Sequence, residues 1–210
     1  MSSPAARRRT LHALGMLLAP AIMLTCDLDL AAAGDPAIFR WSLALQVSMT
    51  LFLLAILGMV AELRPVADRA GLTGGLLAGF GATVGAVMQG HFRTMQTAIE
   101  TVGGAEGEAI REALHAPAYI LTTRAPGLAF PIGLVVLAVA LVATRRAPAL
   151  LGLLVAAGAV LFPIGRIGGL TWAIVASDVV LLVGLGWLGV RTLGGAAAEE
   201  RPAAAEGLAA

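Results

Sequence analysis

Six apolar stretches, each about the length of a membrane-spanning helix, follow one another along the chain and limit its fold more than any other feature. We place them at about 11–26, 41–61, 71–89, 127–143, 149–165 and 170–190. A helix needs roughly 20 residues to cross the hydrocarbon core of a bilayer. Backbone amides find no water there, so helices are the expected spanning form. The sequence therefore predicts an all-α fold in which residues 1–191 form one transmembrane bundle.

The composition supports a membrane protein. Hydrophobic residues make up 59% of the chain and charged residues only 13%, compared with about 25% charged residues in soluble domains. The lipid bilayer is therefore the expected surrounding. The arginines are scattered rather than gathered into a patch, which argues against a nucleic-acid partner. The absence of lysine excludes a Schiff-base retinal protein, and the abundance of Ala, Gly and Arg indicates a GC-rich bacterial genome.

The distribution of the arginines predicts an orientation. Six spans put both termini on one side of the membrane. If that side is the cytoplasm, nine of the 14 arginines fall on inner segments and the remaining five on outer ones. Because inner segments of membrane proteins are enriched in basic residues, we expect a multi-pass protein of the bacterial inner (plasma) membrane with both termini cytoplasmic. Residues 192–210, rich in Ala, Glu and Gly, are expected to form a disordered cytoplasmic tail.

The first span has a second interpretation. A basic head precedes the apolar run and Ala31–Ala33 follows it, which is also typical of a cleavable signal peptide formed by residues 1–33. The further hydrophobic spans favour a retained helix. Residues 27–40 are then expected to form an outer connection that contains Asp27, Asp29 and Asp35.

Residues 90–125 form the longest polar segment between two spans and are expected on the outer side. Within this segment, 105–116 (AEGEAIREALHA) has Ile110 and Leu114 four residues apart among charged residues. This spacing predicts a short amphipathic helix, which could lie on the membrane surface or cap the bundle.

Asp178 is the strongest candidate for a functional group because it lies eight residues inside the last apolar span. A charge at the centre of a bilayer costs about 2.5–3.5 kcal/mol, so this carboxyl group must be paired, protonated or open to water. Arg166 and Arg124, expected near the outer ends of the fifth and fourth spans, are candidate partners. Two interpretations stay open: an acid that binds a proton or a solute, and a structural ion pair that holds helices together.

Other polar residues are expected at the same outer level. Gln89 and His91 end the third span, and Gln46 lies in the outer half of the second. With Asp178 they predict a polar pocket open to the outside. The alternative is an ordinary rim of interfacial side chains.

Glycines recur at four-residue spacing in the third span, as Gly75 and Gly79 and as Gly81 and Gly85. Such spacing allows two helix backbones to approach closely. We interpret these glycines as helix-packing positions.

No catalytic or metal-binding motif accompanies these residues. The chain lacks a Gly-x-Ser-x-Gly elbow, an HExxH motif and a P-loop, and its one cysteine and three histidines match no ligand pattern. We therefore expect no cofactor and no metal. The leading hypothesis is a non-catalytic membrane protein that binds a small ligand, a partner protein or a second copy of itself at the outer polar cluster. The alternative is a small-solute or proton-coupled transporter that uses Asp178, and an enzyme is the third class.

Overall fold

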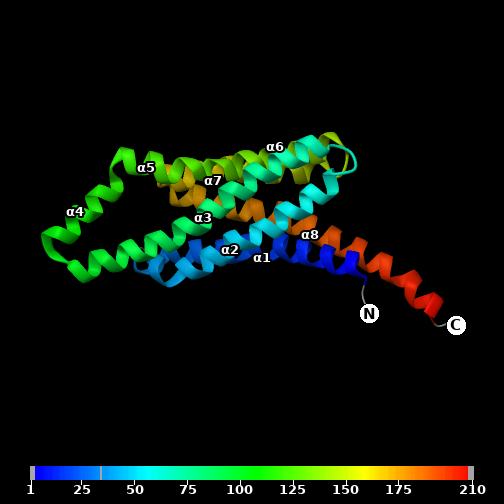
Figure 1. The fold of residues 1–210 in the computed structure, drawn as a ribbon, viewed down its shortest axis with the longest axis horizontal. Helices are drawn as coiled ribbons and strands as arrows, with labels where there is room; N and C mark the ends of the chain where they lie inside the picture. Colours follow the sequence, from blue (N-terminus) through cyan, green and yellow to red (C-terminus); the bar gives the residue numbers. More distant parts are fainter. Residues whose placement is uncertain (1–2, 34, 208–210) are drawn as a thin grey trace.

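The structure, a computed structural model, describes the backbone of residues 3–33 and 35–207, and the side chains of that part except those of 33, 35–40, 115, 120, 124 and 196–207. Every described element is a helix (Figure 1), and six of the helices are long and apolar enough to cross a membrane. The predicted all-α class is thus confirmed, and the six spans indicate a multi-pass membrane protein. The elements are α1 (Pro4–Ala33), α2 (Asp35–Leu63), α3 (Asp68–Val102), α4 (Gly104–His115), α5 (Pro117–Arg124), the 3₁₀ helix η1 (Ala125–Leu128), α6 (Ala129–Ala143), α7 (Ala149–Gly168) and α8 (Thr171–Gly207).

The spanning helices form a closed ring. Each packs against two neighbours, in the order α8, α1, α2, α3, α6, α7 and back to α8. Helix α1 begins and α8 ends at one end of the bundle, which we call the terminal end, whereas α4 and α5 extend beyond the bundle at the opposite end, the α4 end (Figure 1). Because α1 packs against both α2 and α8, the first span is an integral part of the ring.

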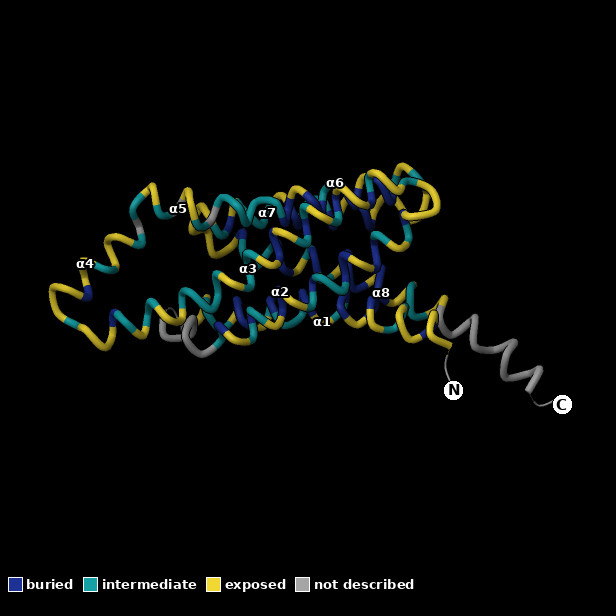
Figure 2. Tube along the Cα trace, viewed as in Figure 1, coloured by how far each residue is buried: buried dark blue, intermediate teal, exposed yellow. Residues whose placement is uncertain are grey.

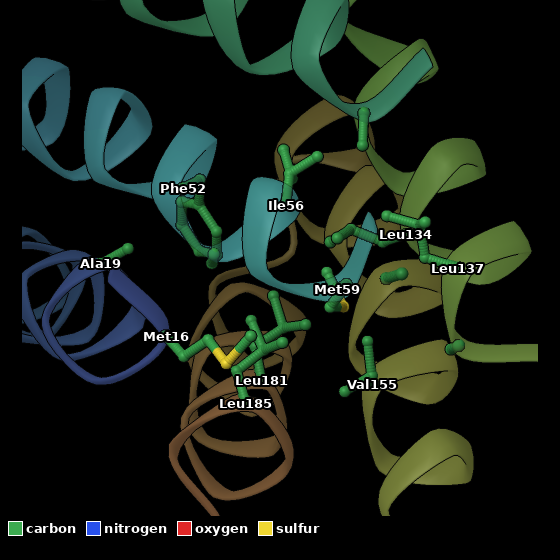
Figure 3. Packing of buried hydrophobic residues seen from close by; sticks show 14 of the residues in the cluster. Met16, Ala19, Phe52, Ile56, Met59, Leu134, Leu137, Val155, Leu181 and Leu185 are labelled. Atoms are coloured by element: carbon green, nitrogen blue, oxygen red, sulfur yellow. The ribbon is translucent and has the colours of Figure 1, made fainter. Parts of the chain in front are cut away.

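Apolar side chains fill the centre of the ring (Figure 3). Phe52 of α2 packs edge to face on Phe130 of α6, with ring centroids 5.0 Å apart. Dark buried segments follow the inward sides of the helices, and exposed segments follow the outward sides (Figure 2). On α3 the outward side chains, such as Leu76, Phe80 and Val87, are apolar and more than half exposed, as expected where a helix faces lipid tails.

The connection predicted at 27–40 is wrong, because most of it is helical. Helix α1 continues through Asp27 and Asp29 to Ala33, and α2 begins at Asp35. Leucine and alanine surround both acids and favour helix. In addition, the indole nitrogen of Trp41 donates to a carboxylate oxygen of Asp29 at 2.5 Å, which ties the two helix ends together. Asp27, which the sequence placed in a connection, therefore belongs to a spanning helix and is buried inside the bundle.

Helix α3 also exceeds the span predicted for it, because it continues to Val102. It ends where Gly103 and Gly104 have φ angles of 63° and 56°, a left-handed backbone that glycine adopts without strain. Helix α4 then covers Gly104–His115, where the sequence predicts the amphipathic helix.

At the other end of the chain, α8 extends to Gly207, into the stretch predicted as a tail; alanine and glutamate there favour helix.

The four glycines of α3 that the sequence predicts as packing positions differ in how closely a neighbouring helix approaches. Gly81 lies directly against the backbone of Phe130 in α6, which leaves no room for a Cβ atom. Gly75 and Gly85 face the ends of side chains in α2. At Gly79 the nearest atom would be 3.8 Å from an added Cβ, an ordinary van der Waals contact. Of these four glycines, only Gly81 lies against the backbone of a neighbouring helix.

Candidate functional site

Three charged side chains from three helices meet inside the bundle. The Nη2 nitrogen of Arg166 in α7 donates to Oδ2 of Asp27 in α1, and the same nitrogen lies 3.5 Å from Oδ1 of Asp178 in α8. Asp178 is fully buried and Asp27 is 2% exposed, whereas the side chain of Arg166 is 23% exposed. We refer to these residues as the Asp27–Arg166–Asp178 cluster. It joins α1, α7 and α8 through one guanidinium group.

The α7–α8 hairpin brings Arg166 beside Asp178. Gly169 ends α7 in the left-handed conformation, at φ 68°. Gly165 and Gly158 then allow α8 to approach, since a Cβ at Gly165 would lie 2.6 Å from a backbone nitrogen of α8. The hydroxyl of Ser177 donates to the carbonyl oxygen of Gly158 at 2.9 Å and fixes the register of the two helices. As a result, the carboxyl group that follows Ser177 faces the last turn of α7.

Asp27 joins the cluster because it continues the buried face of α1. His12, Met16, Ala19 and Met23 are all buried, and Asp27 follows at the same three- or four-residue spacing. The hydroxyl of Ser48 in α2 donates to the carbonyl oxygen of Ala19 at 2.8 Å, which holds this face against α2. Sequence reasoning missed Asp27 because the apolar run was ended at Cys26. The spacing of the buried face was the signal that could have found it.

The surroundings of Arg166 stabilise a positive charge. Its guanidinium carbon lies 4.7 Å from the centroid of the Phe162 ring, within the range of a cation–π interaction. Arg166 also belongs to the last turn of α7, where the helix dipole favours cations. Breaking a buried ion pair by removing one partner typically costs 3–5 kcal/mol, because the other charge remains buried. The three groups should therefore act as one unit.

A cavity of about 450 Å³ lies beside the cluster at the α4 end. Both Arg166 and Asp27 contribute to its wall, which places the cluster at one side of the space. The remaining polar lining includes Gln89, Gln96, Arg111 and Thr123, and much of the apolar lining comes from Met23, Met49, Met88, Phe92, Leu128 and Pro131. A concave, mainly apolar space of this size with a few converging polar groups is typical of a small-molecule site.

The predicted site residues do not all meet. Arg166 and Asp178 are in contact, whereas the side chain of Arg124, the other candidate partner, lies outside the described part. Gln89 lines the cavity. Gln46 and His91 are not in its lining: Gln46 lies beside Gly90, 4.0 Å from where a Cβ would stand, and His91 stacks on Tyr119 with ring centroids 6.1 Å apart.

Ser42, Gln46 and Thr50 recur at four-residue spacing on α2, but they do not all face the bundle. Ser42 is buried, but Thr50 is exposed. The hydroxyl of Thr50 donates to the carbonyl oxygen of Gln46 at 2.9 Å. A threonine that bonds to the preceding turn needs no partner in the bundle, so it can face lipid.

Within the described part of the chain, no group of three or more His, Cys, Asp or Glu side chains is placed to hold a metal ion. No protein-family model, curated protein or solved structure matches the sequence or the fold. The features of the molecule that bear on function are therefore the cavity and the ionic cluster on its wall.

Proposed function

We propose that this chain is a non-catalytic membrane protein that binds a small, mainly apolar ligand in the cavity, with the polar end of the ligand at Arg166. One observation carries the proposal. Arg166 lies on the cavity wall, and the hydrogen bonds it makes with described residues use only its Nη2 nitrogen. A guanidinium group has five N–H donors, so its remaining donors can serve a ligand.

The charge of the site indicates what the polar end of the ligand should be. The two carboxyl groups of the cluster already face the one guanidinium, so an anion would gain little from this arginine. A neutral acceptor, such as a carbonyl oxygen, can accept from the guanidinium without adding charge. The methionine and phenylalanine side chains of the lining favour an apolar body. These features support a neutral ligand with a carbonyl group.

For the setting, we propose the bacterial inner membrane with both chain termini in the cytoplasm. The excess of arginine on the segments at the terminal end supports this orientation. The cavity at the α4 end would then open toward the outer side. A protein partner, including a second copy of the chain, is the other kind of partner that the sequence suggests; the cavity favours a small ligand.

Photolabelling with benzophenone, a neutral apolar ketone, tests the ligand proposal. We expect the full chain in liposomes to be labelled at cavity residues such as Met23, Met49 and Met88, with the sites identified by peptide mass spectrometry. Val84 also lines the cavity, so Val84→Trp should fill part of the space. Labelling of the cavity should fall about tenfold in this variant, which corresponds to about 1.4 kcal/mol of binding free energy.

Val87→Trp is the matched control because Val87 lies on the same helix and is 64% exposed on its outward side. This variant should leave cavity labelling unchanged. Labelling confined to outward-facing residues, or an equal loss in both variants, would contradict a ligand site in the cavity.

Proton-coupled transport of a small solute is the second candidate, because the cavity ends at an ionisable cluster that contains Asp178. A transporter must also open its site to the other side of the membrane. A smaller space of about 110 Å³ lies near His12 and Glu62 at the terminal end. Met16 and Phe52, both fully buried, belong to the packed core of the ring (Figure 3), and neither lines either space. Transport would require these helices to separate, whereas ligand binding does not.

A further inference from the structure

The buried cluster contains more acid than base. Asp27 and Asp178 each supply a carboxyl group, and the ion pairs that both make with described residues lead to the same guanidinium, that of Arg166. If both carboxyl groups were ionised, the cluster would carry a net charge of −1 inside an apolar bundle. A buried charge without a partner is strongly unfavourable. The sequence offers no lysine as an additional base.

Among the side chains that the structure describes, the other groups near the cluster do not supply the missing positive charge. On α1, Cys26 precedes Asp27; its thiol is buried and cannot be a cation. Asp29, two residues beyond Asp27, accepts a hydrogen bond from Trp41. Besides Arg166, the cavity lining contains one basic residue, Arg111 of α4, which bonds to Glu108 at 2.9 Å. The charge balance of the cluster is therefore set by Asp27, Arg166 and Asp178.

The geometry brings the two carboxyl groups together. Both accept from the same nitrogen of Arg166, so the two carboxyl groups lie beside one N–H group. One oxygen of each, Oδ1 of Asp27 and Oδ2 of Asp178, is buried and has no hydrogen-bond partner. Two carboxylates that share one site do not both ionise readily, since each disfavours the charge of the other. A proton between them would supply a donor where the structure has only acceptors.

We propose that Asp27 and Asp178 form a proton-binding site that holds one proton between them, so that the cluster as a whole is neutral. The proton forms an O–H bond with one carboxyl group and a hydrogen bond to the other, and Arg166 balances the remaining negative charge. When the proton leaves, the cluster becomes an anion on the cavity wall. This inference stands without the ligand proposed above, and it would give the transport candidate its coupling group.

Infrared spectroscopy of the full chain in liposomes at neutral pH, with no ligand added, tests the site. The wild-type protein should show the carbonyl band of a protonated carboxyl group, and the band should shift when water is replaced by deuterium oxide. Asp27→Asn and Asp178→Asn should each abolish the band completely, because the remaining carboxylate then faces one guanidinium. Asp29→Asn is the matched control and should keep the band. The helical amide band in the same spectra verifies that each variant is folded.

Three results would overturn the proposal. The first is the absence of a protonated band in the wild-type protein, a measurement that needs no variant. The second is survival of the band in either single Asp27 or Asp178 variant, which would indicate one independent acid. The third is a band that emerges only when sodium is removed from the buffer, since a metal cation would then occupy the place of the proton. Photolabelling by benzophenone is a separate readout, so either proposal can fail alone.

Discussion

Arg166→Gln is expected to lower the free energy of unfolding by about 3–5 kcal/mol, the cost of leaving buried charges without their partner. Arg166 is the only base that pairs with Asp27 and Asp178 in the described part of the chain. Its loss leaves the negative charge of the two buried carboxyl groups without a partner, so that they must take up a further proton or the protein unfolds. The measurement is reversible unfolding in mixed micelles at increasing SDS fraction, followed by the circular dichroism of the helices.

Two further variants make this expectation specific. Arg111→Gln should cost less than about 1 kcal/mol, because the side chains of Arg111 and Glu108 are half exposed and surface ion pairs contribute little. Adding Asp27→Asn and Asp178→Asn to Arg166→Gln should restore much of the lost stability, since no buried charge remains. A triple variant as unstable as Arg166→Gln alone would show that the loss came from packing rather than charge.

Gly81→Ala is expected to destabilise the protein by about 3 kcal/mol, the upper end of the usual cost of overpacking. A Cβ atom at Gly81 would meet the backbone of Phe130. Backbone cannot rotate away as a side chain can, so α3 and α6 would have to move apart. Because α6 also packs against α7, the displacement would extend into the ring. The same unfolding measurement in mixed micelles reports the change.

Gly79→Ala provides the matched control two residues away on the same helix. An added Cβ at Gly79 would have its nearest neighbour at 3.8 Å, so no clash is expected. Alanine is favoured over glycine in a helix by roughly 0.5–1 kcal/mol, and this variant should be neutral or slightly stabilising. Equal losses at Gly79 and Gly81 would contradict close α3–α6 contact as the cause.

Hydrophobic run length predicted the number and order of the spans well, because crossing a bilayer is a property of local composition. The helix ends were predicted poorly, and for a physical reason. Helices α1 and α3 continue beyond their apolar runs. In α1 the added residues 27–33 are mostly leucine and alanine, which favour helix whether or not lipid surrounds them. Hydropathy indicates which segments of the chain can lie in lipid, but it does not indicate where a helix ends.

The candidate site, like the helix ends, could be predicted only in part. Asp178 was found because one carboxyl group inside an apolar run stands out in the sequence. Asp27 was missed because it lies at the edge of its run. The spacing of the buried face of α1 was its one sequence signal, and its contact with Arg166 shows its environment. The cavity could not be predicted, because it depends on how α1, α3 and α7 pack. The grouping of His91 and Gln46 with Asp178 relied on membrane depth alone, and depth does not specify which helices are neighbours.

The contact between Asp27 and Arg166 joins α1 to the buried cluster, and a double-mutant cycle between these residues tests it most directly. The free energy of unfolding would be measured for the wild-type chain, Asp27→Asn, Arg166→Gln and the double variant. We predict a coupling energy of about 1–3 kcal/mol, as found for residues in one ion-pair network, and none between Asp27 and the exposed Arg146 at the other end of the bundle. Additive effects of Asp27→Asn and Arg166→Gln, within about 0.5 kcal/mol, would contradict the buried cluster.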